Sequence, residues 1–121
     1  MDIEQVVTKC REAGETWADF SAAYHRFDKG FKTKFAEIKQ LVRTTQTAPA
    51  GKLKWTSDDL EDATHCHPDW KQFLEDMDKA YANMIKSKVA YDSWRNALDS
   101  ARSIMATERE ERRNIRTTPF D

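Results

Sequence analysis

The chain has 121 residues and a net charge of −1, with 34% charged and 39% hydrophobic residues. This length allows one small domain, and the near-zero net charge argues against an intrinsically disordered chain. Three glycines and three prolines are too few for a turn-rich all-β protein. The longest uncharged stretch, residues 44–51, is too short to span a bilayer, and no segment has the pattern of a signal peptide. Two cysteines, Cys10 and Cys66, give no disulfide framework, which indicates a reducing compartment such as the cytoplasm.

A heptad pattern of apolar residues predicts one long helix over residues 2–43. Its seam positions repeat every seven residues, each with a partner three residues further on, and all except Lys34 are apolar. They are Ile3, Cys10, Trp17, Tyr24, Phe31 and Ile38, with Val6, Ala13, Phe20, Phe27, Lys34 and Leu41. Such a period is typical of an amphipathic helix with coiled-coil-like packing. Asp2 is the expected N-cap. Near Lys34 we expect either a drift of the stripe around the helix, with Phe35 taking over the apolar role, or a local bend near Gly30.

Residues 44–67 are predicted to connect two long helices. The first part, residues 44–51, has the composition of a linker. Thr56 and Ser57 then precede a run of acids, which predicts a short helix over residues 57–64. Leu53, Trp55 and Leu60 are expected to fold this piece back over the ends of the long helices.

The second long helix is predicted over residues 68–115, because Pro68 suits the first position of a helix. Its seam positions are Trp70, Met77, Met84, Tyr91, Leu98 and Met105, with Phe73, Ala80, Ser87, Trp94, Ala101 and Glu108. Trp17 and Trp94 are expected to be buried at similar heights. Thr118 precedes a proline and is expected to end any helix.

These elements predict an all-α fold: a single domain, residues 1–121, built as a long antiparallel two-helix hairpin with a short connecting helix. Further apolar residues lie beside the seam and make the stripe too wide for two helices to cover. These are Val7, Phe35, Val42, Leu74, Tyr81, Ile85 and Ile104. We therefore expect a homodimer that forms a four-helix bundle.

Charge is divided unevenly along the chain. Counting Lys and Arg against Asp and Glu, residues 25–54 carry +6 and residues 55–79 carry −6. An antiparallel hairpin brings these segments together, so the principal expectation is charge matching within the chain. A basic block can also contact phosphates or attract an acidic protein partner.

The connector end is the predicted partner-binding surface, because loops placed by a rigid scaffold often carry function. The candidate residues are Lys39, Arg43, Lys52, Lys54 and Trp55. Trp55 and Phe120 lie outside the seams and are candidate exposed anchors, although Trp55 can equally cap the end of the bundle. An alternative nucleic-acid or anion edge comprises Arg109, Arg112, Arg113 and Arg116.

One cluster, His65-Cys66-His67, has side chains of metal-ligand type. Zinc needs ligands that converge from different directions, which adjacent residues do not provide, and Cys10 is expected at the far end of the hairpin. No metal site is expected within one protomer, while a site shared in an oligomer stays open. His67-Pro68-Asp69 suits a helix boundary better. No catalytic residue or cofactor site is predicted, so the chain is expected to be a non-enzyme.

The second helix contains the segments His67-Pro68-Asp69-Trp70-Lys71, Ala90-Tyr91-Asp92-Ser93-Trp94-Arg95 and Ala101-Arg102-Ser103-Ile104-Met105-Ala106-Thr107-Glu108-Arg109, with Ala80 between them. With Tyr24 and Phe35-Ala36-Glu37-Ile38 of the first helix, they resemble a family of small helical proteins from the early regions of tailed bacteriophages. Such genes tend to lie near recombination and single-strand annealing functions. The resemblance implies an accessory role in phage DNA metabolism or against host nucleases and defences, in the host cytoplasm. It implies no catalytic residue.

The expected function is therefore protein–protein binding by a phage accessory protein, whose partner is a phage recombination protein or a host nuclease or defence complex such as a CRISPR effector. The alternative is a dimeric nucleic-acid-binding protein that uses a basic helix face. The sequence pI of about 6.3 argues against this alternative. A scaffold coiled coil is a third hypothesis, which the sequence does not separate from the first.

Overall fold

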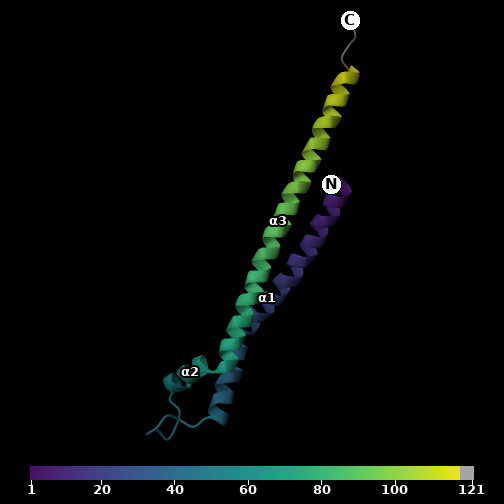
Figure 1. Ribbon diagram of the computed structural model, residues 1–121. Helices are drawn as coiled ribbons and strands as arrows, with labels where there is room; N and C mark the ends of the chain where they lie inside the picture. Colours follow the sequence, from purple (N-terminus) through teal and green to yellow (C-terminus); the bar gives the residue numbers. More distant parts are fainter. Residues whose placement is uncertain (118–121) are drawn as a thin grey trace. The chain divides into compact units, whose positions relative to one another are not determined.

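Apart from Met1, Asp2, the connector and His67, the residues that the structure describes are helical. The computed structural model describes residues 1–117, with side chains up to Ile115, and contains no strand in that range. Its elements are α1 (Ile3–Thr45), α2 (Ser57–Cys66) and α3 (Pro68–Thr117) (Figure 1). The predicted all-α fold with two long helices and a short one is confirmed. The predicted helix end at Thr118–Pro119, the anchor Phe120 and the side chain of Arg116 lie outside the described residues.

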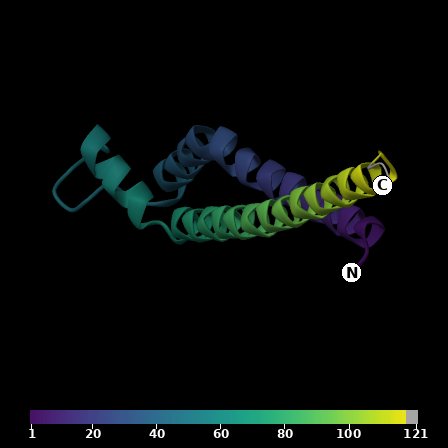
Figure 2. The same cartoon turned by 90° about the horizontal axis from the view of Figure 1, so that it is seen from above.

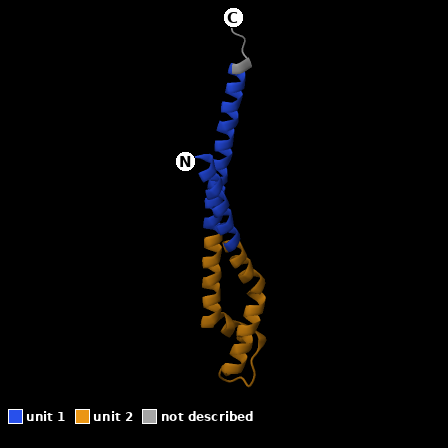
Figure 3. Ribbon diagram, turned by 90° about the vertical axis from the view of Figure 1, so that its right-hand side faces the viewer, with its two compact units in different colours: residues 1–19, 85–121 blue, residues 20–84 orange. Residues whose placement is uncertain are grey.

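Two compact units make up the structure, and both α1 and α3 contribute to each of them. Unit 1 comprises Met1–Asp19 and the part of α3 that begins at Ile85. Unit 2 comprises Phe20–Met84 and includes the whole of α2 (Figure 3). Inside each unit the two long helices pack against each other, as the heptad pattern predicts.

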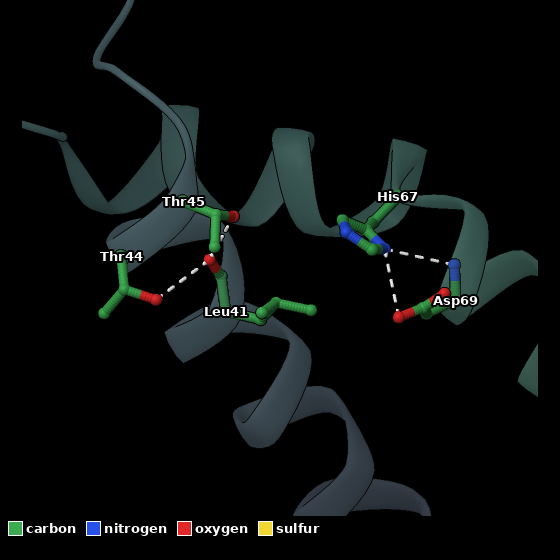
Figure 4. A network of polar contacts seen from close by, with 5 residues as sticks. All are labelled: Leu41, Thr44, Thr45, His67 and Asp69. Atoms are coloured by element: carbon green, nitrogen blue, oxygen red, sulfur yellow. Dashed lines mark hydrogen bonds and ion pairs between the residues drawn. The ribbon is translucent and has the colours of Figure 1, made fainter.

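Hydrogen bonds to side chains close both ends of α1. At its start, the Asp2 carboxylate accepts from the Gln5 N–H at 2.8 Å, and the Gln5 side-chain oxygen accepts from the Asp2 N–H at 2.9 Å. This reciprocal pair is a capping box, and it confirms the predicted N-cap. At its end, the Thr44 and Thr45 hydroxyls donate to the Leu41 carbonyl oxygen at 3.1 and 2.6 Å (Figure 4). Both hydroxyls therefore add a side-chain hydrogen bond to a carbonyl oxygen in the last turns of α1.

A single residue, His67, forms the boundary between α2 and α3. Because it precedes Pro68, its backbone is extended, with φ −68° and ψ 135°, and this ends α2. Its Nδ1 accepts a hydrogen bond from the Asp69 N–H at 3.0 Å, so His67 also caps the start of α3 (Figure 4). The predicted helix boundary at His67-Pro68-Asp69 is confirmed.

The core of unit 2 joins all three helices. Ile38 and Val42 of α1, Leu60 of α2 and Trp70 of α3 are each at most 3% exposed and form one cluster. The Trp70 ring lies 5.0 Å from both the Phe31 and Phe35 rings and 5.4 Å from Phe73, measured between centroids. Trp70 is therefore the centre of the aromatic packing in this unit.

Within unit 2 the buried stripe of α1 leaves the strict heptad. The sequence pattern placed Leu41 in the seam, yet Leu41 is 39% exposed and Val42 is fully buried. Phe31, another seam position, is 37% exposed. A straight helix has 3.6 residues per turn rather than 3.5, so the buried face moves around it along the chain. The predicted drift towards Phe35 is confirmed, and the seam assignment of Leu41 is wrong.

Unit 1 has a smaller core. Val6 and Cys10 of α1 are buried there, and the Trp17 ring stacks on the Tyr91 ring with centroids 5.6 Å apart. Trp17 and Trp94 are half-buried, so the prediction that both are buried is wrong. Two helices alone shield one side of such large rings and leave the other side to solvent.

Two glycines on α1 differ in what surrounds them, and this gives a matched stability test. A Cβ at Gly14 would lie 3.0 Å from Cε2 of Tyr91, whereas a Cβ at Gly30 meets no atom within 4 Å. Alanine is favoured over glycine in a helix by about 1 kcal/mol. We expect Gly30→Ala to stabilise the protein by about that amount and Gly14→Ala to gain less or to destabilise it, measured by urea unfolding. A larger gain from Gly14→Ala would contradict the close packing on Tyr91.

Candidate functional site

The connector between α1 and α2, whose course Figure 2 shows, contains a hydrogen-bonded turn. The Lys52 N–H donates to the Pro49 carbonyl oxygen at 3.1 Å, and Gly51 has a φ of +85°. This combination is that of a type II turn, which needs a residue with positive φ at its third position and therefore favours glycine. The turn directs the chain back towards the start of α2.

An ion pair then ties the loop to α2. The Lys52 ammonium group contacts the Asp59 carboxylate, and the Thr56 hydroxyl accepts from the Asp59 N–H at 3.2 Å as the N-cap of α2. The hydrogen bond from Lys52, with a second from Thr56, lowers the pKa of Asp59 below its ordinary value of 3.8. Lys52, a predicted partner-binding residue, is thus already engaged within the chain.

The pKa of Asp59 gives a direct test of the ion pair between Lys52 and Asp59. A depressed pKa in the folded state means that the ion pair stabilises the fold above pH 3.8 and that this effect is lost as the pH falls through the folded-state pKa. We expect Lys52→Ala to return the Asp59 pKa towards 3.8, measured by carboxyl NMR titration. An unchanged Asp59 pKa in the Lys52→Ala variant would show that the loop is held in another way.

Charge matching between the basic and acidic segments occurs mainly through α2. Among the described residues, two ion pairs join residues 25–54 to residues 55–79: Lys52 with Asp59, and Lys39 with Glu61 at 3.8 Å. Both acids belong to α2. Arg43 contacts Gln40 on its own helix at 3.4 Å. Neutralisation by α2 therefore accounts for two of the predicted partner-binding cations.

The remaining predicted residues of the connector divide into one that packs inward and one that faces solvent. Trp55 is partly buried against the unit 2 core, so it caps the end of the packed helices rather than serving as a free anchor. Lys54 is exposed. Between Lys52 and Lys54 lies Leu53, which is 103% exposed, so the expectation that it folds back over the ends of the long helices is wrong. An apolar residue between two lysines is the feature of the sequence that could have indicated an exposed Leu53.

The alternative arginine edge lies elsewhere, in unit 1. Arg109, Arg112 and Arg113 are exposed on α3. In Figure 3 this part of α3 runs past the start of α1, so no other described helix of unit 1 lies beside it. The structure therefore brings these arginines together only through their spacing on one helix.

The three residues of the His65-Cys66-His67 cluster have separate environments. The His65 ring lies 5.0 Å from the Phe35 ring and 6.5 Å from the Trp70 ring. Cys66 is exposed, and His67 is the helix cap already described. Among the described residues, no three His, Cys, Asp or Glu side chains are grouped closely enough to hold a metal ion.

Comparisons of this chain with models of protein families, with curated proteins and with solved structures find no match. Within the described residues, no helix has a stretch long and apolar enough to cross a membrane. The site is therefore interpreted from its own geometry.

Proposed function

We propose that this protein is a non-enzymatic binding module that engages a protein partner through the connector of unit 2. The observation that supports the proposal best is Leu53, a fully exposed apolar side chain in a loop held by the Gly51 turn and the Lys52–Asp59 ion pair. A loop that is already ordered loses little conformational entropy on binding, which favours affinity. Leu53 supplies apolar contact, and the exposed Lys54 beside it favours an acidic partner surface.

The biological setting that we propose comes from the resemblance to phage early-region proteins. In that setting the protein is a phage accessory factor in the host cytoplasm, and its partner is a phage recombination protein or a host nuclease or defence complex.

Self-association into a four-helix bundle is part of the same proposal. In unit 2, the apolar side chains of α1 that are more than one third exposed include Phe20, Phe31 and Leu41. Large side chains at helix flanks are normally covered by further helices, and a second copy supplies two. The mass measured by light scattering at micromolar concentration tests this part: a dimer supports it, and a monomer contradicts it.

Affinity capture from the host with purified protein tests the binding proposal. The informative variant is Leu53→Asp/Lys54→Glu, because the described structure gives neither side chain a role in the fold. We expect this variant to keep its melting temperature and to lose the partner. Variants of Trp55 and Lys52 are less suitable, because these residues pack on the core and pair with Asp59.

Arg109→Glu/Arg112→Glu is the matched control, since it changes two exposed residues in unit 1. We expect it to retain the partner. Loss of the partner in this control alone would move the binding surface to α3 of unit 1. A salt-dependent gel shift with DNA, together with no protein partner, would instead support the nucleic-acid alternative.

A further inference from the structure

Unit 2 has a groove between α1 and α3 whose two edges carry opposite charges. One cavity of about 480 Å³ is lined by Ala23, Arg26 and Phe27 of α1 and by Phe73 of α3. A second, of about 270 Å³, is lined by Lys34 of α1 and by Asp69, Gln72, Phe73 and Asp76 of α3. Phe73 belongs to both cavities, so they form one groove with an aromatic floor.

The charges at the edges of this groove do not neutralise each other inside the chain. The α1 edge carries Arg26 and Lys34, and the α3 edge carries Asp69 and Asp76. Among the described side chains, no ion pair within 4.0 Å crosses the groove. Asp76 accepts a hydrogen bond from Gln72 at 2.9 Å, which leaves its charge in place. The groove therefore presents a basic edge and an acidic edge to an incoming surface.

Opposite charges also lie at matching heights along the two helices. The Phe27 ring is 5.5 Å from the Phe73 ring, and the Phe31 ring is 5.0 Å from the Trp70 ring. These contacts place Arg26, one residue before Phe27, level with the turn that holds Asp76. In the same way, Lys34 lies level with the start of α3 at Asp69, which lines the same cavity.

We infer that the groove is the dimer interface, and that its occupant is the same groove of a second copy, related by a two-fold axis parallel to the helices. This axis places α1 of each copy on α3 of the other at equal height. Arg26 and Lys34 of one copy then face Asp76 and Asp69 of the other. A two-fold axis across the helices would place α1 on α1, and so basic edge on basic edge, which is repulsive.

The inference rests on the dimer proposed above, and it specifies which face of unit 2 forms the interface and how the two copies are oriented. Leu41, 39% exposed, is seven residues from Lys34 and lies on the same side of α1, so apolar surface is buried beside the charges. With the axis parallel to the helices, the connectors of the two copies lie at the same end of the paired units. Two Leu53 loops side by side would bind a partner that has two sites far more tightly than one loop does.

Charge reversal at each edge tests the interface. Arg26→Glu/Lys34→Glu makes both edges acidic, and Asp69→Lys/Asp76→Lys makes both edges basic. We expect each variant alone to dimerise at least about tenfold more weakly than the native chain, measured by analytical ultracentrifugation at low salt. We expect an equimolar mixture of the two to form a heterodimer, in which each acidic edge meets a basic one. Mixing cannot relieve repulsion within one chain, so recovery identifies contacts between chains.

The opposite face of unit 2 supplies a matched control. Leu74→Glu and Tyr81→Glu change exposed side chains of α3 that do not line the groove, and we expect both variants to remain dimeric. A native dimer that is insensitive to the charge reversals, or one that Tyr81→Glu dissociates, would overturn the inference while leaving the proposed dimer standing. A native chain that is monomeric would overturn both.

Discussion

Replacing Trp70 by alanine is expected to remove most of the stability of unit 2. Trp70 is 2% exposed, and its ring contacts aromatic rings of α1, α2 and α3. Truncating a buried tryptophan costs about 3–5 kcal/mol, because burial is lost and a cavity remains. A small domain has only about 5–15 kcal/mol in total. We expect a large fall in the urea concentration at the midpoint of unfolding, measured by far-UV circular dichroism.

Trp94→Ala is the control for this result. Trp94 is half-buried in unit 1, so less of its surface is removed from water in the folded state. We expect its loss to destabilise the protein clearly less than the loss of Trp70. If the two substitutions cost the same, or Trp94→Ala costs more, the aromatic cluster around Trp70 is not the main core.

Placing a carboxylate at Val42 is expected to have a comparably large effect. Val42 has no exposed surface and lies among Ile38, Leu60 and Trp70. An ionised side chain there has no partner and no water, so Val42→Asp should cost at least about 4 kcal/mol at neutral pH. The measurement is again urea unfolding, repeated at low pH, where protonation of the new carboxyl should recover part of the loss.

A substitution at the neighbouring Leu41 tests which residues form the buried face of α1. Leu41→Asp puts the same side chain one residue away, where 39% of the native side chain is exposed. We expect this variant to remain folded with a modest loss. If the Val42→Asp variant folds and the Leu41→Asp variant does not, the strict heptad seam that the sequence suggests is correct.

The helices were predictable from the sequence because their signals are local. The long helices that the apolar period predicts, the Asp2 cap and the His67-Pro68 boundary each depend on residues a few positions apart, and each is confirmed. The burial of Val42 in place of Leu41 was harder to predict. It depends on how far the buried face has moved around α1 by the end of the helix, because a small displacement in each heptad accumulates along a straight helix.

The connector residues show where sequence reasoning about the site reached its limit. The charge of Lys52 and the position of Trp55 outside the seam predict that both bind a partner. Their engagement with Asp59 and with the core is a tertiary property that spacing does not reveal. For the same reason Leu53 was expected to pack, although it is fully exposed. The position of the connector was predictable, while the roles of its side chains needed the structure.

Site-specific photo-crosslinking at position 53 tests the central claim most directly. A photoreactive phenylalanine analogue replaces Leu53 in one variant and the exposed Ile104 of unit 1 in another, and both are irradiated in host cells. The proposed function predicts a discrete protein adduct at position 53 that disappears when Lys54→Glu is added, and no such adduct at position 104. An adduct at position 104 alone, or crosslinking of position 53 only to nucleic acid, would contradict it.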